Sequence, residues 1–252
     1  MPASAALITG AAHRIGRSLA LGLADEGTAV AIHYNSSEDA ARALADEIKA
    51  KGGHAIALQA DLQDESQFET LTARAAEALG PLDLLINNAS LFEYDSAASA
   101  TKASWDAHMT ANLRAPFVLS QHFAAQLPGG TDGLIVNLLD QRVWALTPHF
   151  TSYTLSKAGL WTLTQTLAQA FAPHIRVNAI GPGPTLKNIR QSDEHFARQQ
   201  QGVILQRGAE LSEFVDAVRF MWTARSMTGQ MIALDGGQHL GWETPDIQGI
   251  DE

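Results

Sequence analysis

The chain has 252 residues, the size of one large domain or two small ones. Hydrophobic residues make up 46% of it, enough for a sizeable core and far from the composition of a disordered chain. Lys and Arg total 17 against 27 Asp and Glu, and the resulting charge of −10 argues against nucleic-acid or anionic-membrane partners. Cys is absent, which excludes disulfides, thiolate metal sites and catalytic thiols.

The beginning of the chain and its apolar runs indicate a cytoplasmic protein. The opening MPASAALITG has neither the basic segment nor the sustained apolar segment of a secretion signal. No apolar run approaches the ~18 residues of a membrane span. We therefore expect an acidic, soluble globular protein with a small-molecule partner.

Short aliphatic runs alternate with segments of helical period along the chain. Strands are expected at 5–9, 28–33, 54–58, 82–86, 134–138, 175–179 and 231–234. Helices are expected near 15–26, 37–51, 64–79, 103–127, 153–172 and 210–223. This alternation is typical of βαβ units, and strands that are nearly all apolar are typical of a sheet covered on both faces. The pattern predicts an α/β fold: a single Rossmann-type doubly wound domain over 1–252, with a seven-stranded parallel sheet flanked by helices on both faces.

Two segments do not fit the alternation of strands and helices. Residues 184–209 are rich in Gln and charge, and they precede the last expected helix. Because ligand sites lie at the carboxyl ends of parallel strands, we expect this segment to be a flap over the substrate. The C-terminal tail at 240–252 carries Trp242 and has no assigned role.

The run TGAAHRIG at 9–16 lies between the first expected strand and the first expected helix. A Gly-rich turn in this place lets backbone N–H groups and the helix N-terminus meet a pyrophosphate. Two glycines six residues apart also occur in ordinary tight turns, but the strand–turn–helix context favours a dinucleotide site. The candidate cofactor-binding residues of this loop are Gly10, His13, Arg14, Ile15 and Gly16.

The end of the second strand favours NADP(H) over NAD(H). The acidic residue that usually bonds the adenosine ribose is missing, and the first acid is Glu38. Asn and Ser can hydrogen-bond a 2′-phosphate that a carboxylate would repel, and Arg14 adds a positive charge nearby. The alternative without a function is that Arg14 only points into solvent from the first turn of the helix. The candidate residues at this strand end are Tyr34, Asn35, Ser36 and Ser37.

Tyr153 and Lys157 stand four residues apart at the start of a strongly helical segment, so they share one helix face. A nearby ammonium lowers the pKa of a phenol from its usual ~10. We therefore expect Tyr153 to act as an acid or base near neutrality.

These elements together resemble the short-chain dehydrogenase/reductase family, from about residue 4 to 238. The resemblance rests on TGAAHRIG at 9–16, Asp61-Leu62, Asn87-Asn88-Ala89-Ser90, Asn112, Tyr153 with Lys157, Gly181-Pro182-Gly183, Thr228-Gly229-Gln230 and Asp235-Gly236-Gly237. It implies that Tyr153 exchanges a proton with substrate, that Lys157 holds the nicotinamide ribose, and that Asn112 anchors a water in the proton relay. It also implies a homotetramer and further cofactor contacts from Asp61, Leu62, Asn88, Ala89, Ser90, Tyr153, Lys157, Pro182 and Gly183.

Three departures from the family pattern point to one branch of it. Asp140 stands thirteen residues before Tyr153, where the family usually has a catalytic Ser. Ser90 follows Asn-Asn-Ala in place of Gly, and Arg14 takes the place of the middle glycine of the loop. These three changes occur together in the pteridine reductase branch of the family, to which this sequence is similar. That similarity implies a substrate site formed by Arg14, Ser90, Phe92, Asp140 and Tyr153.

The chemistry of these residue types agrees with the similarity. Reducing a ring C=N bond requires a proton on nitrogen, for which a carboxylic acid such as Asp140 is a better source than Ser. Phe92 offers a flat apolar face on which a flat ring can stack. The alternatives are a solvent-facing Asp140 and ordinary core packing of Phe92.

Three functions remain open. The first is NADPH-dependent reduction of a pteridine or folate-like ring, with Asp140, Tyr153, Lys157 and Asn112 as catalytic residues. The second is a carbonyl reductase of the same family, acting on a 3-oxoacyl thioester or small ketone, for which Ser is expected at position 140. The third is a non-catalytic dinucleotide sensor, which has no need of a complete proton relay. The nine His residues are scattered without ligand spacing, so no metal is expected.

Overall fold

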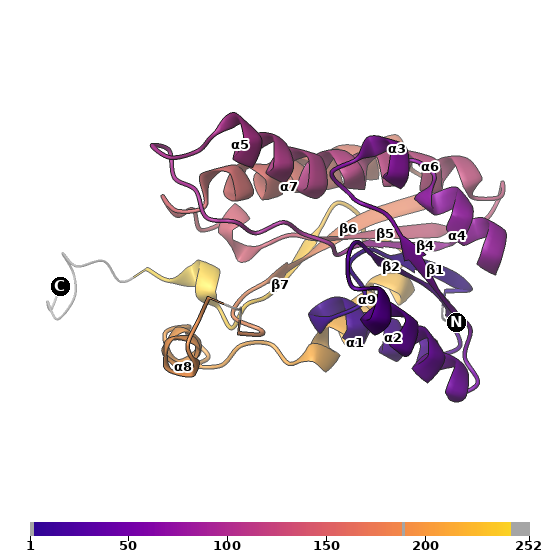
Figure 1. The fold of residues 1–252 in the computed structure, drawn as a ribbon, viewed down its shortest axis with the longest axis horizontal. Helices are drawn as coiled ribbons and strands as arrows, with labels where there is room; N and C mark the ends of the chain where they lie inside the picture. The colour runs from indigo at the N-terminus through magenta and orange to yellow at the C-terminus, as the bar shows by residue number, and fades with distance from the viewer. Residues whose placement is uncertain (1–2, 188–189, 243–252) are drawn as a thin grey trace, which may run out of the picture.

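The computed structural model describes residues 3–187 and 190–242, and its strands form one parallel sheet (Figure 1). The sheet order is β3-β2-β1-β4-β5-β6-β7, with all neighbours parallel. The strands are β1 (Ala5–Ile8), β2 (Ala29–Tyr34), β3 (Ala55–Gln59), β4 (Leu84–Asn87), β5 (Gly133–Leu138), β6 (Ile175–Pro182) and β7 (Met231–Leu234). The expected seven-stranded parallel sheet is confirmed.

Helices cover both faces of the sheet, as expected (Figure 1). The helices are α1 (Arg14–Asp25), α2 (Glu38–Ala50), α3 (Glu65–Phe68), α4 (Leu71–Leu79), α5 (Lys102–Met109), α6 (Ala115–Gln126), α7 (Thr151–Ala170), α8 (Asp193–Gln201) and α9 (Leu211–Thr223). On one face α1, α2 and α9 bury side chains such as Leu19, Leu44 and Phe214 against the sheet. On the other face α4, α6 and α7 bury Leu71, Phe123 and Leu167. The two cores account for the nearly all-apolar strands between them.

The helix expected over 103–127 is divided by a π-helical turn. The chain forms α5, then the π turn η1 (Thr110–Arg114), then α6. Pro116 lies in the first turn of α6 and has no N–H to donate to the residue four positions earlier. The wider π turn accommodates this missing bond, and Asn112 lies within it.

Two other expectations differ in detail from the structure. The helix expected over 64–79 is divided into α3 and α4 by Glu69 and Thr70, whose backbones stay near helical angles, so the division is a local distortion. The segment 184–209 contains the unexpected helix α8. None of the side chains of α8 is fully buried. Of the tail, residues 240–242 are described and 243–252 lie outside the described residues.

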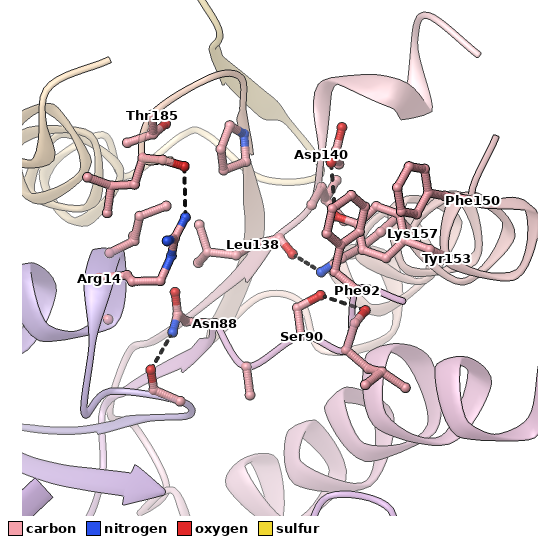
Figure 2. Close-up of a pocket in the computed structure, with 18 of the residues that line it drawn as sticks. Arg14, Asn88, Ser90, Phe92, Leu138, Asp140, Phe150, Tyr153, Lys157 and Thr185 are labelled. Atoms are coloured by element: carbon pink, nitrogen blue, oxygen red, sulfur yellow. Dashed lines mark hydrogen bonds between the residues drawn. The ribbon is translucent and has the colours of Figure 1, made fainter. Parts of the chain in front are cut away.

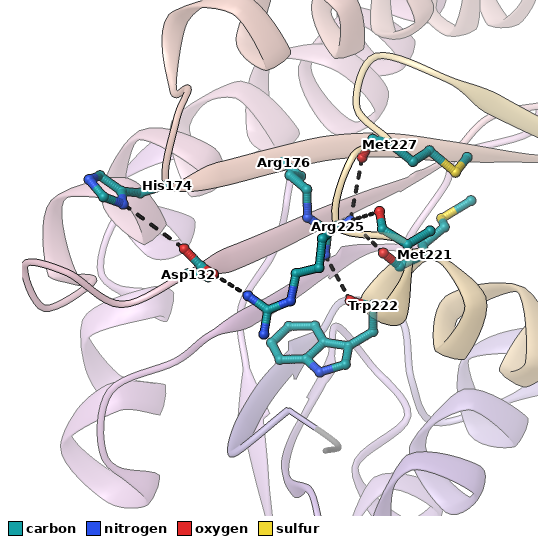
Figure 3. A network of polar contacts seen from close by, with 8 residues as sticks. Asp132, His174, Arg176, Met221, Trp222, Arg225 and Met227 are labelled. Atoms are coloured by element: carbon teal, nitrogen blue, oxygen red, sulfur yellow. Dashed lines mark hydrogen bonds and ion pairs between the residues drawn. The ribbon is translucent and has the colours of Figure 1, made fainter.

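Arg176 on β6 joins the sheet to the C-terminal end of α9 (Figure 3). Its guanidinium donates to four backbone carbonyls at and beyond that helix end, those of Met221, Trp222, Ala224 and Met227. Carbonyls at a helix C-terminus lack partners within the helix, and a cation there also complements the helix dipole. Beside it, Asp132 forms an ion pair with Arg225 and approaches His174 at 4.0 Å. The network fixes α9 against β6.

Two kinds of feature are missing from the described residues. None of their helices has the length and apolar character needed to cross a membrane. Nor do three or more His, Asp or Glu side chains gather among them in a way that could hold a metal ion.

Candidate active site

A cavity of about 1110 Å³ opens at the carboxyl ends of the strands (Figure 2). The sheet order reverses between β3 and β4, so that β1 lies between β2 and β4. The loops that follow β1 and β4 separate at this reversal and leave a crevice, which is where ligands bind in doubly wound sheets. The loops after β5 and β6 complete the cavity wall.

His33 at the end of β2 fixes the Gly-rich loop. Its Nδ1 accepts the backbone N–H of Gly10 at 3.0 Å, and its Nε2 lies 3.0 Å from the carbonyl oxygen of Ala60. Only a neutral ring with its proton on Nε2 makes both bonds. Burial lowers the pKa of His33 to about 4, so the ring stays neutral near pH 7. This imidazole therefore ties together the ends of β1, β2 and β3.

Asn88 fixes the same loop from the end of β4. Its side-chain amide donates to the carbonyl oxygens of Thr9 and Gly10, at 2.8 and 3.0 Å (Figure 2). A Cβ at Gly16 would lie 2.5 Å from the Gly10 carbonyl oxygen, so the N-terminal turn of α1 packs tightly on the loop. The loop thus presents backbone N–H groups of a helix N-terminus to the cavity, an arrangement that suits a pyrophosphate.

Arg14 links the Gly-rich loop to residues 186 and 187, which belong to the segment expected to be a flap. Its backbone has φ +56°, a left-handed conformation that is unfavourable for a residue with a side chain. Its guanidinium donates to the carbonyl oxygens of Leu186 and Lys187, at 2.9 and 2.8 Å. Figure 2 shows one of these bonds. The side chain is exposed, but it is bound to the carbonyl oxygens of residues 186 and 187 and does not merely extend into solvent.

Most of the expected cofactor-binding residues meet at this cavity. Those that line it are Gly10, His13, Arg14, Ile15, Gly16, Asn35, Asp61, Leu62, Asn88, Ala89, Ser90, Tyr153, Lys157, Pro182 and Gly183. Tyr34, Ser36 and Ser37 are not among its lining residues. At the end of β2, the cavity is therefore bordered by the amide of Asn35 rather than by a carboxylate.

Asp95 holds the N-terminus of α7, which carries Tyr153. Its carboxylate accepts from the backbone N–H of Ser152 and the hydroxyl of Ser104, each at 3.0 Å. Its backbone carbonyl accepts the N–H of Phe150 at 2.8 Å. Burial alone would raise the pKa of Asp95, but the bonds from Ser152 and Ser104 hold it below its ordinary value. An anion at this helix end is also favoured by the helix dipole.

The hydroxyl of Tyr153 donates to Oδ2 of Asp140 at 2.9 Å (Figure 2). The expectation of a lowered tyrosine pKa is wrong for this structure. Burial and the adjacent carboxylate of Asp140 raise the pKa of Tyr153 well above its ordinary value, because both disfavour a phenolate. Asp140 is neither solvent-facing nor isolated, since it shares a hydrogen bond with the tyrosine.

Lys157 is fully buried behind the tyrosine. Its Nζ donates to the carbonyl oxygen of Leu138 at 2.7 Å and lies 5.8 Å from the Tyr153 ring centroid (Figure 2). Burial lowers the pKa of Lys157 to about 8, against the attraction of Asp140. The ammonium is therefore directed at the end of β5 rather than at the tyrosine hydroxyl.

Asn112 is fully buried beside the cavity and does not line it. Its side chain accepts the backbone N–H of Leu91 at 2.7 Å and donates to the Leu91 carbonyl and to Ser156 Oγ, at 2.9 and 3.0 Å. Protein groups thus occupy both ends of the amide. The side chain therefore holds the loop after β4 against α7, and the expected role of Asn112 in anchoring a water of the proton relay stays a prediction.

Aromatic rings and two arginines surround the hydrogen-bonded pair of Tyr153 and Asp140. The ring of Phe92 stacks on Phe150 with centroids 4.4 Å apart, and it meets the Tyr153 ring edge-on at 4.6 Å. The guanidinium groups of Arg142 and Arg190 lie 5.2 and 5.3 Å from the Phe92 centroid. Phe92 is half-buried in the cavity wall, so its packing is not that of a core residue.

Several important residues were missed by sequence reasoning. His33 and Asp95 act through bonds to residues more than twenty positions away, which no local pattern reveals. Phe150 has a left-handed backbone directly before α7, again without a sequence signal. Arg142 stands two residues after Asp140, and this proximity was the one available signal.

Comparisons with known proteins identify a family and relatives with bound NADP or NADPH, in agreement with the dinucleotide cavity described above. The family model for short chain dehydrogenase matches residues 4–198. FolM alternative dihydrofolate reductase 1 from Brucella canis, whose crystal structure holds NADP, is 52% identical, with 96% of each chain covered and a TM-score of 0.94. A blue fluorescent protein from a metagenomic library, in complex with NADPH, is 32% identical over 93% of this chain and 97% of its own, with a TM-score of 0.86. The 3-oxoacyl-(acyl-carrier-protein) reductase FabG of Staphylococcus epidermidis is 32% identical over 240 residues, 93% of this chain and 98% of its own. The chain belongs to the short-chain dehydrogenase family.

Proposed function

We propose that the protein is an NADPH-dependent reductase of a pteridine or folate-like ring. The observation that carries this proposal is the 2.9 Å hydrogen bond between Tyr153 and Asp140, which places a carboxylate where a carbonyl reductase of the family is expected to have Ser. The stacked ring of Phe92 beside this pair supplies an aromatic wall. The 52% identity to FolM alternative dihydrofolate reductase 1 supports the same substrate class.

The cavity fits a phosphorylated dinucleotide. Two glycines of its wall leave no room for a side chain. A Cβ at Gly10 would lie 2.9 Å from Ala89 Cα, and one at Gly183 would lie 2.5 Å from Asp235 Cα. We assign the pyrophosphate to the N-terminus of α1, and the 2′-phosphate to the region of Asn35 and the Gly-rich loop. When bound, NADPH supplies the hydride that reduces the substrate.

The side chains of this chain supply the proton. Tyr153 donates its hydroxyl proton to the ring nitrogen of the C=N bond as the hydride reaches the neighbouring carbon, so one C–H and one N–H bond form. Its raised pKa keeps the hydroxyl protonated until that moment. Asp140 holds the hydroxyl in place and returns a proton to it from solvent. Lys157 provides the positive charge that offsets the phenolate formed in between.

A carbonyl reductase is the second candidate, because the FabG relatives are 32% identical over nearly the whole chain. Its substrates need a hydrogen-bond donor at the carbonyl oxygen. Asp140 accepts two hydrogen bonds, from the Tyr153 hydroxyl and from the backbone N–H of Arg142, and so does not supply the additional donor for which Ser is expected at this position. A non-catalytic sensor is less well supported, since Tyr153 and Asp140 are already arranged for proton transfer.

We further propose that the protein is a cytoplasmic homotetramer, as the family resemblance implies. The resemblance implies that the helices around 103–127 and after Tyr153 form a four-helix seam between subunits. Trp105 on α5 and Leu155 on α7 lie on these helices, and both are exposed. Light scattering after gel filtration is expected to give the mass of four chains of 27.0 kDa. A monomer mass would contradict the assembly and leave the catalytic proposal in place.

NADPH oxidation with three substrates tests the proposed function. Dihydrobiopterin, dihydrofolate and an acetoacetyl thioester are compared side by side at equal concentrations. We expect turnover with at least one of the two ring substrates to exceed that with the thioester by about tenfold or more in kcat/KM. Preference for the thioester would establish the carbonyl reductase, and inactivity with all three would remove both.

A further inference from the structure

Arg142 carries an unused hydrogen-bond donor in the wall of the cavity. It lies in the 3₁₀ turn η2 (Gln141–Val143) directly after Asp140, and it lines the cavity. Its Nη1 is buried and has no hydrogen-bond partner among the described residues. Arg190, which lies over the same Phe92 ring, instead bonds to Glu93 at 2.9 Å. Among the described residues, Arg190 thus has an acidic partner, whereas Arg142 has none.

Aromatic rings hold the Arg142 guanidinium in place. Its Cζ lies 4.9 Å from the ring centroid of Phe150, 5.2 Å from that of Phe92 and 5.8 Å from that of Tyr153. Ring faces attract a cation, but they do not supply the oxygen acceptor that a guanidinium N–H finds in water. A buried donor without an acceptor is unfavourable, because its hydration is lost without replacement. The rings therefore fix the position of the guanidinium while Nη1 stays unsatisfied.

The same turn fixes Arg142 relative to the proton-donating pair. The backbone N–H of Arg142 donates to Asp140 Oδ1 at 2.9 Å, and Asp140 Oδ2 accepts the Tyr153 hydroxyl at 2.9 Å. A substrate ring that reaches the Tyr153 hydroxyl and packs beside Phe92 consequently lies next to the guanidinium. An oxygen acceptor on that substrate can then meet Nη1.

We propose that Arg142 is a specificity-determining residue that donates from Nη1 to an oxygen acceptor of an aromatic substrate. The acceptor is either a carbonyl oxygen on the ring or a carboxylate on its substituent, and guanidinium groups bind both. Binding replaces an unsatisfied donor by a charge-assisted hydrogen bond, so it favours rings with the acceptor over rings of the same shape without it. This inference rests on the proposed function, because it names the group by which the ring substrate is recognised.

Calorimetric titration of the NADP⁺-loaded protein tests the proposal without turnover. Three ligands share the bicyclic ring: 2,4-diaminopteridine has neither oxygen, pterin has the ring oxygen, and folate has the ring oxygen and carboxylates. They are titrated into wild type, Arg142→Met and Arg142→Lys. The matched control is Arg198→Met, which removes an exposed guanidinium from α8 outside the cavity wall. Thermal midpoints of all variants establish that they are folded.

We expect Arg142→Met to weaken folate binding by about tenfold or more and diaminopteridine binding by less than about twofold. Arg142→Lys should recover part of the loss, and Arg198→Met should bind all three ligands as wild type does. An equal loss for pterin and folate identifies the ring oxygen as the acceptor, whereas a loss confined to folate identifies the carboxylate. Unchanged binding of pterin and folate to Arg142→Met, or equal weakening of all three ligands, overturns the inference.

Turnover measurements on the wild-type protein distinguish a failure of the proposed function from a failure of the proposed role of Arg142. Arg142-dependent folate binding without NADPH oxidation on dihydrofolate or dihydrobiopterin would refute the reductase activity and support the recognition role. Turnover of these substrates with constants that Arg142→Met leaves unchanged would do the reverse. A wild-type protein that binds none of the three rings would refute both.

Discussion

The Tyr153 hydroxyl and Asp140 Oδ2 are joined by a 2.9 Å hydrogen bond between the N-terminal turn of α7 and the loop after β5. Burial and the carboxylate keep the proton on the tyrosine, whose pKa they raise. The pair thus stores one proton between two oxygens, beside the aromatic wall and within the cavity. Much of the expected behaviour of the protein follows from this arrangement.

Replacing Tyr153 by Phe removes the proposed proton donor and retains the ring. We expect kcat to fall by at least about 100-fold, as is usual for the loss of a general acid. The Kd for NADPH should stay within about threefold, since the Phe ring preserves the packing against Phe92. Stopped-flow NADPH oxidation and fluorescence titration measure the two quantities. Full activity in this variant would remove the proposed role of the hydroxyl.

Replacing Asp140 by Ser exchanges the carboxylate for the family's usual hydroxyl. We expect the kcat/KM for dihydropterin reduction to fall by about tenfold or more, because the acceptor that holds Tyr153 is lost. Reduction of a small ketone should fall less or increase. The ratio of the two kcat/KM values in wild type and variant is the measurement, and an unchanged ratio would withdraw the main support for ring reduction.

His33 makes stability fall with acid over a defined range of pH. The folded pKa of about 4 lies below the ordinary value of 6.5, so between these values the unfolded chain binds a proton that the folded chain does not. This group alone should lower the free energy of unfolding by about 1.4 kcal/mol for each pH unit below 6.5, until pH 4. Urea unfolding at pH 7, 6 and 5 should show a smaller decline in His33→Asn. His54→Gln, at an exposed His, should decline as wild type does.

Replacing Arg14 by Gly separates backbone strain from side-chain function. The left-handed backbone at φ +56° costs a non-glycine residue about 1 kcal/mol, which Gly does not incur. Two hydrogen bonds to Leu186 and Lys187 are lost in return. We expect the free energy of unfolding to change by less than about 1 kcal/mol, while the Kd for NADPH rises by about tenfold. Unchanged NADPH affinity by fluorescence titration would show that the guanidinium serves only the flap.

Replacing Arg176 by Met tests the network at the end of α9. Several backbone carbonyls lose a charged donor, and we expect unfolding in urea to require about 2–3 kcal/mol less. The matched control is Arg225→Met, because its ion pair with Asp132 lies on the surface, with the arginine side chain 71% exposed. That variant should lose less than about 1 kcal/mol. Equal losses in the two variants would contradict the importance of the carbonyl contacts.

The sheet could be predicted because its information is local. Seven apolar runs gave seven strands, with boundaries shifted by at most a few residues, as at β4 and β6. The pairing of Asp140 with Tyr153 was implied by the resemblance to the pteridine reductase branch, and the structure contains that contact. What remained hidden depends on distant partners. Lys157 at four residues suggested an acidic tyrosine, but its ammonium is bound by the Leu138 carbonyl.

The orientation of the Asn112 side chain could not be predicted from the sequence for a related reason. Its position in the long helix was clear from the sequence, but the π turn that Pro116 permits decides where the amide points. The unexpected helix α8 has no buried apolar face, so it lacks the periodic pattern by which the other helices are identified.

The stack of Phe92 on Phe150 makes substrate entry an exchange rather than the filling of an open slot. A substrate ring that takes the place of Phe150 on Phe92 exchanges one ring-to-ring contact for another and leaves the guanidinium groups of Arg142 and Arg190 beside Phe92. A flat aromatic ligand can replace a ring-to-ring contact with one of equal quality, whereas a saturated acyl chain cannot. If the proposed function holds, these rings should favour flat aromatic ligands over aliphatic competitors already at the binding step.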